Sequence, residues 1–238
     1  PMSDILVHTE AGVMTLTLNR VDKKNSITAA MYSTLADALD QAKADAAVRV
    51  VLLQGDATVF SAGNDIGDFL HKPPAGQDSP VFRFLHGIAA FPKPIVAAVC
   101  GPAVGIGTTM LLHCDLVYAG DNAAFALPFV NLGLCPEAAS SLLVPFMAEA
   151  ALEVGLVNRV VPPTEANAIA QAQARKLAAK PISSLIETKR LMKKGQAALV
   201  AQQMTEEGAV FGRMLGEPAA REAFTAFMEK RKPDFSQS

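Results

Sequence analysis

Residues 101–141 read GPAVGIGTTMLLHCDLVYAGDNAAFALPFVNLGLCPEAASS. Near their start, Gly105, Ile106 and Gly107 separate an apolar strand predicted over 95–99 from a helix predicted over 108–113. A turn of small residues that leads into a helix presents backbone N–H groups that the helix does not satisfy itself. These donors, at the positive end of the helix dipole, suit an anion or a carbonyl oxygen that becomes one. We therefore predict a donor turn here, although an ordinary connection would have the same pattern.

Glu137 lies further along this stretch, in the loop CPEAASS, among apolar and small residues rather than charged ones. A carboxylate in such surroundings is a candidate acid or base. The alternative is that it caps a helix predicted to begin near Ala138, because carboxylates favour helix N-termini. A donor turn and one unpaired carboxylate together indicate enolate chemistry.

A second donor turn is predicted at residues 60–66, FSAGNDI. It follows a β-branched strand predicted over 48–53 and opens a short helix over 66–70. Ala62 and Gly63 are small enough to let a ligand approach the backbone, and Asp65 suits a helix cap. Two such turns on neighbouring strands could aim two N–H groups at one oxygen, which is the geometry of an oxyanion hole.

The rest of the chain predicts an α/β fold. Residues 5–8 and 13–18 form a hairpin, and short strands follow at 116–118 and 124–126. Helices are predicted over 28–44, 81–90, 164–179, 181–194, 198–215 and 219–230. Buried strands that alternate with helices favour a parallel sheet. We divide the chain into an α/β core with the active site, residues 1–162, and an all-helical region, residues 163–238, which is either a subdomain or an oligomer-forming tail.

Composition excludes several classes of protein. Half of the 238 residues are hydrophobic, and the formal net charge of −2 leaves no basic footprint for nucleic acid. The three cysteines lack metal or disulfide spacing, and the four histidines form no metal-binding pair, so we predict no metal site. From these residues we expect no signal peptide, and no apolar run is long enough to span a membrane. We expect a soluble, cytoplasmic protein.

Several motifs together resemble the crotonase superfamily, the enoyl-CoA hydratase and isomerase family. They cover nearly the whole chain: LNRxxKxNS from Leu18, FSAGND, KPIVAAVCGPAVGIG, HCDLVYAG, AALEVGLVNRVV and FMEKRKPDF. The resemblance implies a spiral of strand–strand–helix units with a C-terminal helical trimerisation region, assembled as a homotrimer or a dimer of trimers. It also implies an acyl-CoA thioester substrate and no prosthetic group, so coenzyme A enters only as part of the substrate.

The same resemblance assigns site residues. It implies that the backbone N–H groups of Ala62 and Ile106 form the oxyanion hole. It places coenzyme A near two lysines, the second donor turn and the C-terminal FMEKRK motif. The implied coenzyme A contacts are Lys23, Lys24, Ala62, Asn64, Asp65, Ile66, Phe227 and Lys230, the last two from a neighbouring subunit. Solvated helix faces are the alternative for the lysines.

Two departures from the family pattern decide the expected reaction. Hydratases of this family use two glutamates, and this chain has Thr109 and Phe129 at those positions. Glu137 stands instead where a branch of Δ3,Δ2-enoyl-CoA isomerases has its single base. The resemblance therefore implies isomerisation of 3-enoyl-CoA to 2-enoyl-CoA, a step of fatty acid β-oxidation. Phe129 would help to keep water out.

A third departure is that SSLLVP runs directly into PFMAEAALEVG. The family normally has a helix and loop between such segments, so we expect a missing segment between residues 144 and 146. Other open alternatives are an enoyl-CoA hydratase, a hydrolase, and a dienoyl-CoA isomerase with Asp68 as second carboxylate. A non-catalytic acyl-CoA-binding or RNA-binding scaffold is a different class. RNA binding would be sensitive to salt.

Overall fold

A computed structural model describes residues 3–71, 76, 78–143 and 155–236. Its main sheet has six strands in the order β1-β2-β3-β4-β6-β8. The strands are β1 (Ile5–Glu10), β2 (Val13–Leu18), β3 (Val50–Gln54), β4 (Ile95–Val99), β6 (Leu116–Gly120) and β8 (Arg159–Val161). Only the β1–β2 hairpin is antiparallel among these pairs. The predicted α/β class, hairpin and parallel core are confirmed.

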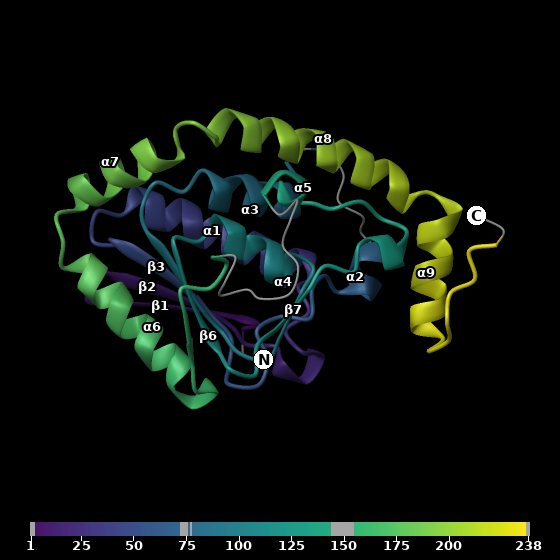
Figure 1. Cartoon of the computed structure of the whole chain (residues 1–238), viewed down its shortest axis with the longest axis horizontal. Coiled ribbons are helices and arrows are strands. Elements are labelled where there is room, and N and C mark those ends of the chain that lie inside the picture. The colour runs from purple at the N-terminus through teal and green to yellow at the C-terminus, as the bar shows by residue number, and fades with distance from the viewer. Residues whose placement is uncertain (1–2, 72–75, 77, 144–154, 237–238) are drawn as a thin grey trace.

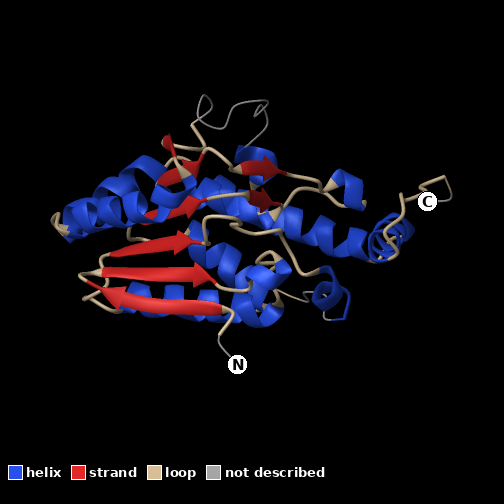
Figure 2. Cartoon of the chain, turned by 90° about the horizontal axis from the view of Figure 1, so that it is seen from below, coloured by secondary structure: helices blue, strands red, loops and turns tan. Residues whose placement is uncertain are grey.

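Helices cover both faces of this sheet, because side chains of the inner strands are apolar on both faces. On one face, Val51 and Leu53 of β3 pack with α1 (Ala29–Ala44) and α3 (Pro80–Ala89) in the largest core cluster. On the other face, Val50 and Leu52 pack with alanines of α6 (Pro163–Ala178). Figure 2 shows the sheet between its helices. This sandwich fixes the strand ends from which the site is built.

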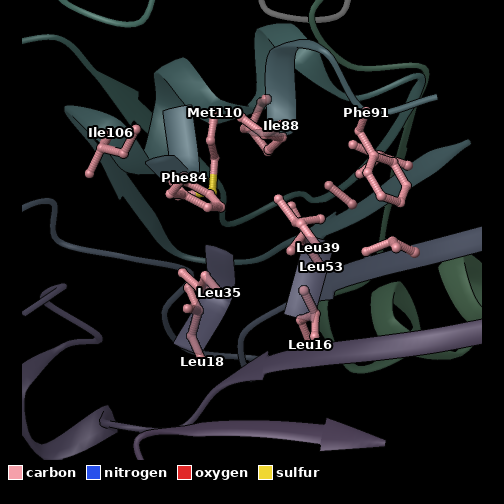
Figure 3. Close-up of a cluster of buried hydrophobic side chains, with 14 of the residues drawn as sticks. Leu16, Leu18, Leu35, Leu39, Leu53, Phe84, Ile88, Phe91, Ile106 and Met110 are labelled. Carbon is pink, nitrogen blue, oxygen red and sulfur yellow. The ribbon is translucent and has the colours of Figure 1, made fainter. Parts of the chain in front are cut away.

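A second, two-stranded sheet pairs β5 (Pro102–Val104) with β7 (Ala124–Ala126). The sequence pattern did not predict β5. It leads into α4 (Ile106–Thr109) and then the 3-10 helix η2 (Met110–His113). Figure 3 shows the Ile106 side chain in the same buried cluster as Phe84 and Met110. The side chain of Ile106 therefore anchors the turn, while its backbone remains at the surface of a cleft described below.

The C-terminal helices form an arch over one side of the molecule (Figure 1). They are α7 (Ile182–Lys193), α8 (Ala197–Leu215) and α9 (Pro218–Met228), and α8 packs on α3 and on the short α5 (Ser140–Leu143). Two further short elements, α2 (Ile66–His71) and η3 (Val130–Leu132), lie near α9. None of the helices in the described ranges has both the length and the apolarity that crossing a membrane requires.

Candidate active site

The two predicted donor turns lie side by side. Ser61 forms a parallel bridge with Ala103, and the Val104 N–H donates to the Ser61 carbonyl oxygen over 2.9 Å. A Cβ on Gly107 would lie 2.8 Å from that same oxygen, which is closer than real Cβ contacts. Glycine is therefore required at position 107 if α4 is to pack directly on the first turn. The prediction that two neighbouring strands bring the turns together is confirmed.

The free N–H group of the first turn is not the predicted one. The Ala62 N–H donates to the Lys24 carbonyl oxygen over 2.9 Å, so it is occupied. Two residues on, Asn64 pairs with Ile27 in a parallel bridge. The Ile27 N–H donates to the Gly63 carbonyl oxygen, and the Asp65 N–H donates to the Ile27 carbonyl oxygen. In such a bridge the N–H of Asn64 itself points away from Ile27. No described residue accepts a hydrogen bond from the backbone N–H of Asn64. The assignment of Ala62 as a donor was therefore wrong.

In the second turn, the predicted donor is the backbone N–H of Ile106. Ile106 is the first residue of α4, and its N–H precedes every possible acceptor within that helix. The neighbouring Gly105 N–H is occupied by the Ala126 carbonyl oxygen over 2.8 Å. Within the described part of the chain, the Ile106 N–H has no acceptor. Asn64 and Ile106 thus present two backbone donors to the same space.

Asn25 holds the first turn in place and was not recognised as a site residue from the sequence. It is fully buried with a φ of 52°, and its amide donates to the carbonyl oxygens of Val59 and Phe60. Its own carbonyl oxygen accepts from the Ser61 hydroxyl over 2.9 Å. The NS pair of the LNRxxKxNS motif is the sequence signal for this role, because asparagine tolerates the left-handed region and bonds to nearby backbone.

A cleft opens over the two donors and continues to Glu137. Its first part is lined by both turns, by Phe129 and by aromatic side chains of the C-terminal helices. Its second part contains Glu137 and Tyr32, and the two parts share Asn64, Phe69 and Phe211. Phe211 lies on α8, so the helical region completes the cleft that was assigned to residues 1–162. Glu137 is the only carboxylate among the described residues that line either part.

Glu137 is held by Thr109, the last residue of α4, one turn after Ile106. The Thr109 hydroxyl is buried and donates to Glu137 Oε1 over 2.6 Å. Glu137 does not cap a helix with its side chain, because α5 begins at Ser140, and Ser140 instead bonds to the Glu137 carbonyl oxygen. Thr109 was interpreted from the sequence only as a missing carboxylate. The structure gives it a positive role, which is to orient the carboxylate that is present.

The surroundings of Glu137 make it a proton acceptor and donor near neutral pH. Burial raises the pKa of Glu137 from its ordinary value near 4.5 to about 7; the Thr109 hydrogen bond opposes this shift and the charge of Glu207 adds to it. Tyr32 is also buried, and its hydroxyl donates to Asn64 Oδ1 over 2.5 Å. The presence of Glu207 corrects the expectation that Glu137 has no charged neighbour.

Two carboxylates near the first turn are structural. Asp65 accepts from Arg20 over 2.7 Å and from the Asp68 N–H at the start of α2, and these contacts lower its pKa against the opposing effect of burial. Asp68 in turn accepts from the Ala29 N–H at the start of α1 over 2.6 Å. Asp65 is therefore a cap, and Asp68 ties two helix ends together rather than facing the cleft.

The other predicted coenzyme A contacts are spread over two surfaces. Ala62, Asn64 and Ile66 line the cleft, and Lys23 and Lys24 are exposed immediately beside the first turn. Phe227 is 60% exposed near the end of α9, and Lys230 follows it with a φ of 56°. On α9 it is Phe224, one turn earlier, that lines the cleft.

The raised pKa of Glu137 predicts a cost in stability. Between pH 4.5 and about 7 the native state keeps a proton that the unfolded chain has lost, so the free energy of unfolding falls as the pH rises through this window. We expect Glu137→Gln to remove this fall and to be more stable than the wild type at about pH 8, by about 1–3 kcal/mol. Urea unfolding at about pH 4.5 and pH 8 measures it, and an equal difference between the proteins at both pH values would contradict it.

The chain is similar to known proteins in both sequence and fold. The fold and the paired donor turns define an α/β enzyme of the crotonase type. The family model for enoyl-CoA hydratase/isomerase matches residues 8–145 and 142–238, so the chain belongs to the enoyl-CoA hydratase/isomerase family. Its reaction is of the acyl-CoA hydratase/isomerase type, and the family acts on acyl-CoA substrates.

Three similar proteins illustrate the range of this family. The 1,2-epoxyphenylacetyl-CoA isomerase of Escherichia coli is 35% identical, over 99% of each chain. The 2,3-dehydroadipyl-CoA hydratase of the same organism is 31% identical, over 98% of this chain and 99% of the relative. An enoyl-CoA hydratase/isomerase structure from Pseudoalteromonas atlantica superposes with a TM-score of 0.92 at 37% identity, over 98% and 100% of the two chains. Both reaction types occur among them.

Two further predictions from the sequence concern a missing segment and the absence of a metal site. The two family matches meet at residues 142–145, next to the expected missing segment, but residues 144–154 lie outside the described residues, so that expectation stays a prediction. Among the residues that the structure describes, no group of three or more His, Cys, Asp or Glu side chains could hold a metal ion.

Proposed function

We propose that this protein isomerises 3-enoyl-CoA to 2-enoyl-CoA with Glu137 as its single acid–base residue. The observation that carries the proposal is a buried carboxylate with a pKa of about 7 in a cleft that also presents two unoccupied backbone donors. One carboxylate is enough for this reaction, because the proton removed from one carbon is returned to another.

Each step uses a group in the cleft. The thioester oxygen accepts hydrogen bonds from the N–H groups of Asn64 and Ile106, which acidify the C2 proton. Glu137 removes that proton, and the electron pair of the C2–H bond delocalises over C2, C3, C4 and the thioester oxygen as a dienolate. The protonated Glu137 then returns the proton to C4, which leaves a double bond between C2 and C3. A pKa near 7 lets one group serve in both directions.

Hydration is disfavoured because the positions that would activate water hold Thr109 and Phe129. Phe129 is buried and lines the cleft beside the donors, where it supports exclusion of water. Glu207 does not supply the second carboxylate, since its oxygens bond to backbone and it does not line either part of the cleft. The remaining elements of the proposal are a homotrimer, a role in fatty acid β-oxidation, and coenzyme A contacts from Lys23, Lys24 and a neighbour's Phe227 and Lys230.

The deciding measurement is a pair of assays on the wild-type protein. We expect conversion of 3-hexenoyl-CoA to the conjugated 2-enoyl thioester, with hydration of 2-hexenoyl-CoA at least about 100-fold slower. The isomerase kcat/KM should rise tenfold per pH unit up to about pH 7 and then level off, because the free enzyme needs ionised Glu137. Hydration at a comparable rate would overturn the single-base mechanism. No turnover of either substrate would favour another acyl-CoA reaction or a binding protein.

A further inference from the structure

Glu207 is a buried acidic side chain for which the proposed reaction has no direct use. It lies on α8, is 5% exposed, and belongs to a different region of the chain from Glu137. Its Oε2 accepts from the Ala139 N–H over 2.6 Å, and its Oε1 accepts from the Ser141 N–H over 3.0 Å. The Ser141 hydroxyl also donates to Oε1. All three donors belong to residues 135–141, which we call the Glu137 loop.

The hydrogen-bond chain around Ser141 indicates that Glu207 acts as an ionised acceptor. Gln203, one turn earlier on α8, donates its amide to the Ser141 hydroxyl oxygen over 2.7 Å. The proton of that hydroxyl is therefore free to point at Glu207. Two N–H groups and one O–H group then converge on one side chain, which suits a carboxylate and not a neutral amide.

The Glu137 loop needs such support because its backbone is strained. Ala138 and Ala139 both have a φ of 58°, a conformation that costs residues with a Cβ about 1 kcal/mol or more each. Glu207 fixes the loop on one side. On the other side His113, whose pKa burial lowers to about 4, is neutral and donates Nε2–H to the Ala138 carbonyl oxygen over 2.8 Å. His113 and Glu207 therefore hold the two ends of a single peptide unit, the one between Ala138 and Ala139, which immediately follows Glu137.

Charge gives Glu207 a second effect on Glu137. The titratable groups around Glu137 are Tyr32 of α1, His113 of η2, Glu207 of α8 and Cys135 of its own loop, while α3 contributes only apolar side chains to this part of the cleft. Burial raises the pKa of the Cys135 thiol, so it is neutral near pH 7. Tyr32 and His113 are neutral near pH 7. Among the described neighbours, the only full charge that acts on Glu137 is therefore that of Glu207, and a like charge favours the protonated form.

We propose that Glu207 is the positioning residue of this active site: it holds the strained Glu137 loop from α8 and, as a fixed buried anion, keeps Glu137 able to take up a proton. The expected effect of Glu207 on kcat rests on the proposed function, whereas its expected effect on the pKa of Glu137 does not. The arrangement also makes α8, one of the C-terminal helices, part of the support of the active site, because displacement of α8 would release the loop.

The test compares three variants with the wild type. Glu207→Gln keeps the length and removes the charge; Glu207→Asp keeps the charge and withdraws it from the loop. The matched control is Glu206→Gln, the same change at the exposed neighbouring position of α8. Each protein is labelled with 13C at the glutamate carboxyl carbon, the Glu137 signal is identified by its loss in Glu137→Gln, and 3-hexenoyl-CoA kinetics are measured in parallel.

We expect Glu207→Gln to lower kcat by about tenfold or more with KM within about twofold, and to lower the titration midpoint of Glu137 by at least about half a pH unit. Glu207→Asp should lose kcat but keep the midpoint, and Glu206→Gln should match the wild type. A wild-type midpoint and kcat in Glu207→Gln would overturn the proposal. If that variant does not fold, Glu207→Asp decides: a wild-type kcat overturns it. A wild type without isomerase activity, but with a midpoint that shifts in Glu207→Gln, would refute the proposed reaction and retain the coupling.

Discussion

Glu137→Gln should lower kcat for isomerisation of 3-hexenoyl-CoA by about a thousandfold, within the range of about 10²–10⁴ that a positioned acid–base group contributes. The amide has the same shape, and its oxygen can still accept from the Thr109 hydroxyl, so the cleft should keep its form. What the variant loses is the ability to take the C2 proton and return it. KM should remain within about threefold, because the donors that hold the thioester are untouched.

Measurement of kcat and KM at about pH 8 tests this, with Glu206→Gln as the control for an exposed charge change. Stability separates the chemistry from folding, because the same Glu137→Gln protein is expected to unfold at higher urea concentration than the wild type at this pH. Loss of kcat in a variant that is also more stable is not explained by unfolding, and an unchanged KM then assigns the loss to the chemical step. Turnover within about tenfold of the wild type would show that another residue moves the proton.

Local pattern predicted most elements of this fold. The strands at Val13–Leu18 and Ile95–Val99 were predicted with their observed bounds, since alternation and apolar runs reflect burial on one or both faces. The strand Pro102–Val104 was missed because three residues beginning with proline have no such period. It exists through its pairing with β7, a partner distant in sequence. The missed strand is also the one that brings the second donor turn against Ser61.

The candidate site was predicted in outline but not in detail. Small residues between a strand and a helix located both turns, yet the pattern does not show which N–H faces the cleft. The Lys24 carbonyl oxygen decides this, because it accepts from the N–H of Ala62 and so leaves the N–H of Asn64 as the unoccupied donor. Thr109 could have been placed from spacing, because it follows Ile106 by one helical turn. Glu207 could not, since its contact with the Glu137 loop depends on how α8 crosses α5.

Ile106→Pro should lower kcat/KM for the same substrate by about 10²–10³, the loss measured when one oxyanion donor is removed. Proline deletes the N–H of Ile106 and changes little else in the backbone. Position 106 is the first residue of α4, where proline is favoured because that N–H has no acceptor within the helix. The preceding residue is Gly105, with φ 55° and ψ −120°, and it has no Cβ to clash with the proline ring.

The control must account for the side chain, because Ile106 is 1% exposed and belongs to the buried cluster that contains Phe84 and Met110. Ile106→Val removes one methyl group at a cost of about 0.5–1.5 kcal/mol in stability and keeps the N–H. If the donor is what matters, Ile106→Val retains kcat/KM within about threefold, while Ile106→Pro loses two to three orders of magnitude. Equal losses in both folded variants would assign the effect to packing. If Ile106→Pro is as active as Ile106→Val, the thioester oxygen is held elsewhere. The dienolate mechanism would then lack the N–H donor that stabilises its oxygen.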